Sequence, residues 1–165
     1  MQEVAAGGRE SLAEMRKLLD VLRDESPSTS QGGRFPQPNL ASLDDLIDDV
    51  RKTGLDVDLK IAGERGAVSE VTQATIYRIV QESLTNILKH ARDATQVAVA
   101  LEFRPTGARF AIQDDGGPAR RVDESWASSG NGLRGMRERV AIFDGTLDAG
   151  PTDAGWLVRG ELRLV

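Results

Sequence analysis

The segment from Glu70 to Ala91 constrains the fold most, because it is the longest stretch of the chain with a single helical period. At about 100° per residue, one stripe of such a helix is apolar throughout. The stripe consists of Ile76, Val80, Leu84, Ile87 and Ala91. A helix with one apolar stripe buries it against a second layer of structure. The chain is therefore predicted to build its core on this helix.

A second sector of the same predicted helix is polar, and it contains Arg78, Glu82, Asn86, Lys89 and His90. A solvated charged face is the simplest interpretation. Asn argues against it, since Asn is a poor helix former unless its amide is used. Asn86 lies one turn after Glu82 and one turn before His90. A carboxylate, an amide oxygen and an imidazole at this spacing can hold a hard cation together with its anion.

Helices and strands alternate through the rest of the second half of the chain. An amphipathic helix is predicted from the spacing of Leu43, Leu46, Ile47 and Val50, with Ser42 as N-cap and Gly54 as its end. Strands are predicted at residues 56–62, 95–103, 108–114, 146–149 and 156–165, and a last helix at 133–143. Pro105-Thr106-Gly107 is the predicted turn between the second and third strands.

The N-terminal part of the chain differs in kind. Residues 9–24 have a Leu/Met stripe at helical spacing, formed by Leu12, Met15, Leu18, Leu19 and Leu22. The residues that follow are rich in Ser, Pro, Gly and Gln, which is typical of a linker. The predicted organisation is a helical segment over 1–25, a linker over 26–38 and one folded domain over 39–165.

Composition excludes several classes of function. The 165-residue chain has a formal net charge of -5 and no basic stripe, which argues against nucleic acid as a partner. It contains no cysteine, so Cys-ligated zinc and Cys nucleophiles are excluded. No apolar run approaches the roughly 18 residues of a membrane span, so no membrane contact is expected of this segment.

Two glycine-rich loops follow the long predicted helix. The first runs from Gln113 to Pro118 and reads Gln-Asp-Asp-Gly-Gly-Pro, and the second is Gly130-Asn131-Gly132-Leu133. Alone, the Asp-Gly pair would be an ordinary turn, and a Gly-x-Gly pattern is weak. The second loop precedes a predicted helix, however, and a helix that begins on glycine presents N–H groups to phosphate.

The sequence from Tyr77 to Ala91 closely resembles the N box of sensor histidine kinases, in the subgroup that pairs with response regulators bearing LuxR-type DNA-binding domains. The resemblance implies that Asn86 ligates Mg²⁺ and that Glu82 assists the water shell of the metal. It also implies that Lys89 and His90 lie near the phosphates of ATP. His90 would then be a residue of the ATP site and not a phosphoacceptor.

The two glycine loops resemble the glycine boxes of the same family. The resemblance implies that Asp114 accepts the adenine amino hydrogen, that Gly116 lets the backbone approach the base, and that residues 119–129 form the ATP lid. Gly130, Gly132 and Leu133 match the second box. The family often reads Asp-x-Gly-x-Gly, whereas Pro118 stands at the last position here, and Gly117 could take over by a shift of one residue.

The fold implied by this resemblance is a two-layer α/β (α+β) sandwich of the Bergerat type, with a mixed, mostly antiparallel sheet, helices on one face and an N-terminal helix before it. The implied function is the ATP- and Mg²⁺-binding catalytic domain of a two-component kinase. Residues 12–23 resemble the second helix of the dimerisation domain, so the acceptor histidine of the preceding helix is expected to be absent. The chain should then bind ATP without phosphorylating itself. The full-length kinase is expected to be a homodimer that passes the phosphoryl group to a response regulator with a LuxR-type DNA-binding domain. This segment is expected to be a cytoplasmic domain of a membrane-bound receptor.

Two alternatives remain open from the sequence. One is a relative from the same superfamily, such as an anti-sigma-factor serine kinase, although residues 12–23 and the N-box pattern argue against it. The other is a degenerate module that keeps the fold for protein contacts and binds no nucleotide. Pro118 permits that second alternative, whereas intact Asn86, Asp114 and Gly132 oppose it.

Overall fold

The computed structural model describes residues 39–91, 93–117 and 131–163. The chain divides into two units, Met1–Pro36 and Gln37–Val165, and all described residues lie in the second. The helical elements are η1 (Leu40–Ser42), α2 (Leu43–Lys52), η2 (Arg65–Ala67), α3 (Glu70–His90) and α5 (Asn131–Ala141). The strands are β1 (Asp56–Ala62), β2 (Gln96–Arg104), β3 (Gly107–Asp114), β4 (Thr146–Pro151) and β5 (Trp156–Arg163).

Some predictions lie outside the described residues. These are the helix over 9–24, the linker over 26–38, the lid over 119–129, Pro118 and Gly130. No helix among the described ranges is both long enough and apolar enough to cross a membrane.

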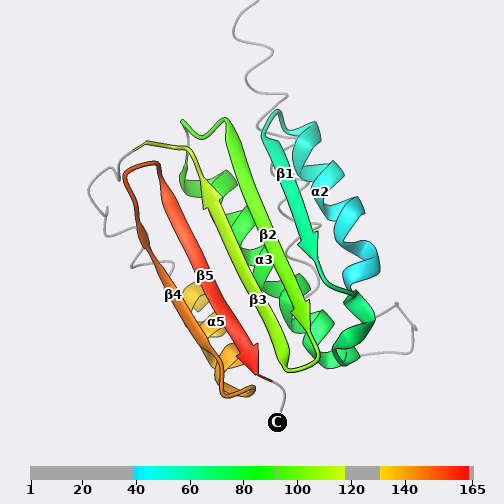
Figure 1. Cartoon of the computed structure of the whole chain (residues 1–165). Coiled ribbons are helices and arrows are strands. Elements are labelled where there is room, and N and C mark those ends of the chain that lie inside the picture. The colour runs from blue at the N-terminus through cyan, green and yellow to red at the C-terminus, as the bar shows by residue number, and fades with distance from the viewer. Residues whose placement is uncertain (1–38, 92, 118–130, 164–165) are drawn as a thin grey trace, which may run out of the picture. The chain divides into compact units, whose positions relative to one another are not determined.

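The five strands form one mixed sheet in the order β1-β2-β3-β5-β4. β1 pairs with β2 in parallel, and the other three pairings are antiparallel. Figure 1 shows α2, α3 and α5 together on one face of this sheet, with α3 behind β2 and β3 and α5 behind β4 and β5. The predicted two-layer α/β sandwich, with a mostly antiparallel sheet and helices on one face, is confirmed.

The core lies between the sheet and the helices. Alternate side chains of β2 are buried there, namely Val97, Val99, Leu101 and Phe103, as expected for a strand with one covered face. The predicted stripe of α3 is also buried, with Ile76, Val80 and Leu84 fully inaccessible. α3 is buried well beyond that stripe, because α2 and α5 pack beside it and cover polar side chains as well. Ser83 Oγ, for example, contacts the sulfur of Met136 on α5 at 3.8 Å.

The predicted boundaries differ from the structure in detail. Ser42 is the N-cap residue of α2, as predicted, but its side chain makes no capping hydrogen bond; Asn39 caps the preceding turn η1 by accepting from the Ala41 N–H. Gly107 belongs to β3 and not to the turn; its φ is +147°, and a side chain there would run into the backbone of Leu162. α5 begins at Asn131, two residues before the predicted helix, and ends at Ala141.

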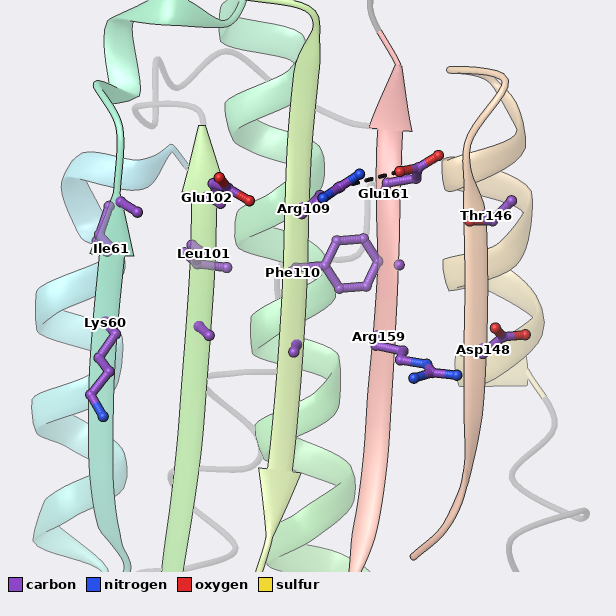
Figure 2. Close-up of a pocket in the computed structure, with 14 residues that line it drawn as sticks. Lys60, Ile61, Leu101, Glu102, Arg109, Phe110, Thr146, Asp148, Arg159 and Glu161 are labelled. Carbon is purple, nitrogen blue, oxygen red and sulfur yellow. Dashed lines mark ion pairs between the residues drawn. The ribbon is translucent and has the colours of Figure 1, made fainter. Parts of the chain in front are cut away.

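The face of the sheet opposite the helices carries a broad hollow (Figure 2). Small side chains of Ala100 and Ala111 lie at neighbouring positions of β2 and β3 and leave room there. Charged side chains surround them, including Lys60, Asp148 and Arg159. The hollow therefore has charged side chains at its margins and small side chains in its middle.

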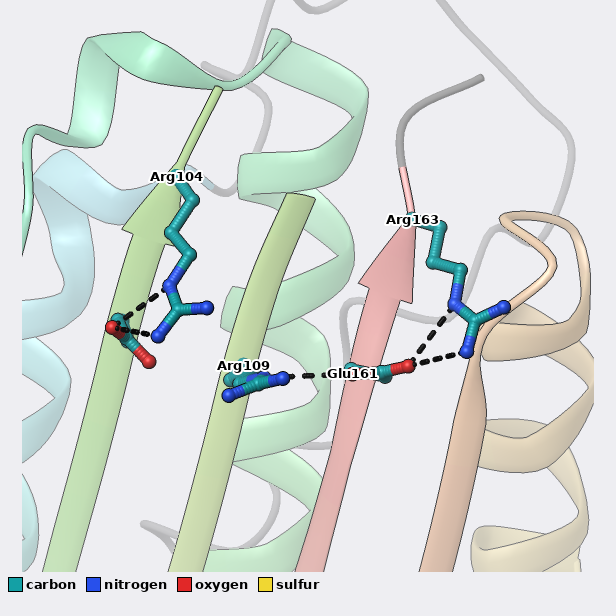
Figure 3. Close-up of polar contacts among 5 residues, drawn as sticks. Arg104, Arg109, Glu161 and Arg163 are labelled. Atoms are coloured by element: carbon teal, nitrogen blue, oxygen red, sulfur yellow. Dashed lines mark hydrogen bonds and ion pairs between the residues drawn. The ribbon is translucent and has the colours of Figure 1, made fainter. Parts of the chain in front are cut away.

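Ion pairs cluster at one end of the same face (Figure 3). Arg109 and Arg163 both contact the carboxylate of Glu161, at 3.5 and 2.8 Å, and Arg104 contacts Glu102 at 2.6 Å. The hydrogen bond and charge of Arg163 lower the pKa of Glu161, with a smaller effect of Arg109. Each arginine thus already has a carboxylate partner, and the Arg109–Glu161 pair joins the neighbouring strands β3 and β5.

Candidate functional site

The polar sector of α3 meets the beginning of α5. Asn86 is 7% exposed and Glu82, one turn earlier, is half-buried, so this sector is not a solvated face. Gly132 lies directly against the Glu82 carboxylate, and a Cβ at Gly132 would collide with it. The same Cβ position is 3.6 Å from the Asn86 amide nitrogen. A side chain at this position would displace the Glu82 carboxylate, so Gly132 lets that carboxylate lie against the first turn of α5.

Lys89 and His90 occupy the last turn of α3. Lys89 is exposed and His90 is half-buried. Burial lowers the pKa of His90, and the neighbouring Lys89 charge lowers it further. Both effects disfavour the charged imidazolium, and an anion bound beside His90 would favour it.

That argument predicts a shift of the His90 pKa on ligand binding. In the nucleotide-free chain the pKa is expected below the ordinary value of 6.5, and saturating MgATP is expected to raise it, because phosphate charge stabilises imidazolium. NMR titration of the imidazole protons measures this pKa. The chain has a single histidine, so these signals belong to His90. A pKa that nucleotide leaves unchanged would place the phosphates away from His90.

Asp114 is the last residue of β3 and is only 3% exposed. Its Oδ1 accepts a hydrogen bond from the Gly116 N–H at 2.9 Å. Its Oδ2 is buried and has no hydrogen-bond partner among the described residues. An unsatisfied buried carboxylate oxygen costs stability, so this atom is a strong acceptor that is available to a donor from a ligand.

The loop after Asp114 is held close to the end of α3. A Cβ at Gly116 would lie 3.6 Å from the Ala91 methyl and 3.7 Å from the Ala94 methyl. Gly117 has a left-handed backbone, with φ of +84°, and its N–H donates to the carbonyl of Ala154 at 3.0 Å. Gly117 thus supplies the conformational freedom that the sequence pattern expects from a glycine one residue later.

Asp115 anchors this loop to the start of β2, a role that the sequence reasoning missed. Its carboxylate accepts from the backbone N–H groups of Thr95 at 2.7 Å and Gln96 at 2.8 Å, and from the Thr95 hydroxyl at 2.7 Å. These hydrogen bonds, led by that of the Gln96 N–H, lower the pKa of Asp115. The only signal in the sequence was the pair of adjacent aspartates, which does not tell the two roles apart.

Asp115→Ala is expected to lower the free energy of unfolding at pH 7 by about 1 kcal/mol, because water replaces the lost hydrogen bonds at this exposed site. The lowered pKa means that this contribution is complete above about pH 4 and is lost as the pH falls through the folded-state value. Urea denaturation at pH 7 and near pH 3 measures the loss of stability and its pH dependence. Asp153→Ala, in the β4–β5 turn, is the control. If the stability difference between Asp115→Ala and the unaltered chain grew on acidification, the assignment would be contradicted.

The structure thus brings the predicted residues into two neighbouring groups. Glu82, Asn86 and Gly132 form one, and Asp114 with Gly116 forms the other, joined to the first through the end of α3. Leu133 is half-buried in the first turn of α5, and Lys89 stands at the exposed margin. The first group belongs to α3 and α5, and Asp114 lies two residues after the buried Ile112 along β3, so both groups are on the helix-covered side of the sheet.

Comparison with curated proteins finds sensor histidine kinases. The chain is 32% identical over 144 residues to the histidine-protein kinase/phosphatase DegS of Brevibacillus brevis, covering 84% of this chain and 34% of DegS. It is 32% identical to the sensor histidine kinase LiaS of Bacillus subtilis, over 90% of this chain and 38% of LiaS, and 35% identical to YxjM of the same species, over 89% and 33%. The chain therefore spans about a third of the length of these relatives.

Solved structures agree on the fold. The histidine kinase domain of the blue-light activated kinase EL346 of Erythrobacter litoralis matches with a TM-score of 0.58 and 23% identity, over 93% of this chain and 75% of that domain. The ATP-binding domain of PrrB from Mycobacterium tuberculosis matches with a TM-score of 0.50 and 21% identity, over 75% and 90%. No protein-family profile matches the chain. The relatives of this chain are thus sensor histidine kinases, and its fold is that of the solved histidine kinase and ATP-binding domains.

Proposed function

We propose that residues 39–165 bind ATP with Mg²⁺ and present its γ-phosphate to a histidine of the kinase other than His90. The phosphoryl group would then pass to an aspartate of a response regulator. The observation that carries the proposal is the buried Oδ2 of Asp114, which has no hydrogen-bond partner in the part of the chain that the structure describes. A buried carboxylate oxygen without a donor is costly unless a ligand supplies one, and the adenine amino group is such a donor.

The remaining residues fit the other parts of the nucleotide. Gly116 leaves no side chain between the base and the loop, and Gly132 opens the first turn of α5, where N–H groups and the helix dipole favour phosphate. Gly130 and Leu133 flank that turn in the sequence. Lys89 and His90, at the end of α3, are proposed to contact the phosphates from the opposite side.

Asn86 is the proposed Mg²⁺ ligand, and Glu82 orients metal-bound water. Among the described residues no three His, Cys, Asp or Glu side chains gather into a metal site of their own. A single amide oxygen with a nearby carboxylate suits Mg²⁺, which usually keeps several waters and takes its other ligands from phosphate. The bound ion would neutralise charge on the triphosphate, and the side chains of α3 would hold it in place.

The chain's own contribution to phosphoryl transfer is positioning. Asp114 fixes the base, α5 and Lys89 fix the phosphates, and Asn86 fixes the metal, so that the γ-phosphate meets an incoming nucleophile in a single geometry. We propose that the regulator is of the LuxR type, from the N-box pattern of Tyr77 to Ala91, and that the complete kinase acts as a homodimer on the cytoplasmic side, where ATP is available.

Incubation of the chain with γ-labelled ATP tests the assignment of His90. We expect the chain to bind nucleotide without acquiring an acid-labile phosphoryl label. His90 is half-buried beside the proposed phosphate site, where it is proposed to contact the phosphates and not to attack them. Acid-labile label on the chain, lost in His90→Gln, would contradict the assignment.

The two alternatives from the sequence are less well supported. The relatives found are sensor histidine kinases, which favours histidine as acceptor over the serine of an anti-sigma-factor system. A degenerate module has no reason to keep a buried carboxylate oxygen unpaired at Asp114.

A further inference from the structure

The β4–β5 turn is built against the first glycine loop. The Ala154 carbonyl accepts from the Gly117 N–H at 3.0 Å, and the Thr152 hydroxyl accepts from the Gln113 side-chain amide at 3.2 Å. Gly155 is buried directly against Asp114, where a Cβ would collide with the backbone oxygen and Oδ1 of that residue. The residue after this turn, Trp156, is therefore fixed close to the site.

The strand register places Trp156 beside Asp114. β3 and β5 pair Ile112 with Val158 and Gln113 with Leu157, so the next position of this antiparallel ladder sets Asp114 opposite Trp156. Along β5, Trp156 lies two residues before the buried Val158, and along β3, Asp114 lies two residues after the buried Ile112. Side chains two residues apart in a strand share a face of the sheet. Both side chains therefore point to the helix-covered side of the sheet.

Trp156 differs from the other described aromatic side chains in exposure and place. Tyr77, Phe103 and Phe110 are buried in the core, and Phe143 lies at the far end of β5, where its carbonyl accepts from the Arg163 N–H. The indole of Trp156 is half-buried. It is thus the described aromatic group that offers part of its surface at the end of the sheet where Asp114 lies.

We propose that the indole of Trp156 forms a wall of the base subsite and packs against the purine whose amino group Asp114 binds. The inference rests on the proposed function, since it needs a nucleotide at Asp114. A carboxylate accepts a hydrogen bond from the amino group of a purine but does not contact the faces of the purine ring. An aromatic side chain next to the carboxylate supplies that apolar contact at low entropic cost. Trp156 is in this account a specificity-determining residue for a purine base.

The test uses the full chain with Trp126→Phe, which leaves Trp156 as its single tryptophan. MgADP is expected to quench the Trp156 emission saturably, with the dissociation constant that calorimetry gives for the same variant. Magnesium tripolyphosphate, which has no base, is expected to leave the emission unchanged. Quenching by tripolyphosphate equal to that by MgADP, or no change with MgADP, would overturn the inference.

Affinity gives a second readout. In the unaltered background, Trp156→Ala is expected to weaken MgADP binding about tenfold, in line with loss of one base–aromatic contact. Trp156→Phe, which keeps a ring, should stay within about threefold, with circular dichroism confirming that both variants fold. Equal affinity of the alanine variant overturns this inference alone, whereas failure of the unaltered chain to bind MgADP overturns the proposed function with it.

Discussion

Asp114→Asn is expected to weaken adenine-nucleotide binding at least about 100-fold. The variant keeps an oxygen for the Gly116 N–H but places an amide nitrogen where the buried Oδ2 stands, so donor faces donor at the adenine amino group. A hydrogen bond to a charged group is worth about 1.5–3 kcal/mol, and the clash of two donors adds to its loss. Calorimetric titration with MgADP measures the effect.

The same variant should not destabilise the nucleotide-free protein. A neutral amide is cheaper to bury than an unpaired carboxylate, so the free energy of unfolding is expected to stay unchanged or to rise. Asp148→Asn removes the same charge from the opposite face of the sheet and serves as control, with unchanged affinity. A variant that loses stability and binding together would mean that Asp114 is a structural residue.

Asn86→Ala is expected to abolish the dependence of nucleotide binding on Mg²⁺. In the unaltered chain, we expect removal of Mg²⁺ by EDTA to weaken ATP binding, because the metal links the phosphates to the amide oxygen. Loss of a metal-site partner typically costs 10–100-fold in metal affinity. The alanine variant should therefore bind ATP with the same affinity in Mg²⁺ as in EDTA, close to the EDTA value of the unaltered chain.

Asn86→Asp is the matched variant, because it keeps an oxygen at the same position. It is expected to retain Mg²⁺ dependence, whereas a purely structural role of the buried amide would make both variants equally impaired. Asn86 is 7% exposed, so thermal unfolding of both variants without nucleotide belongs to the experiment. Mg²⁺ dependence that survives in Asn86→Ala would assign the metal to another ligand.

Local periodicity predicted most of the helices and strands, and the resemblance to sensor histidine kinases implied their arrangement. The apolar stripe of α3 and the alternation of β2 each report one covered face, and the covered faces together define two layers. The errors lie at the boundaries. The sequence does not show that the side-chain capping hydrogen bond comes from Asn39, before η1, and not from Ser42, the N-cap residue of α2. Glycine is common both in turns and at strand ends, so Gly107 is predicted in the turn although it belongs to β3.

The sequence alone could not predict which distant segments lie in contact. Nothing in the sequence around Gly132 shows that it lies against Glu82, and nothing around Gly155 shows that it lies against Asp114. Both depend on the packing of α5 and on the register of β5, which are set by the whole core. Glu82 and Asn86 lie against the start of α5, and Asn86 is buried, which periodicity within one helix cannot show.

The most direct test of a nucleotide site in residues 39–165 is a calorimetric titration of the chain with ATP, once in Mg²⁺ and once in EDTA. The account predicts one binding site per chain, tighter in Mg²⁺ than in EDTA. Absence of binding at millimolar ATP in both conditions would contradict it and would favour a module that keeps the fold for protein contacts alone.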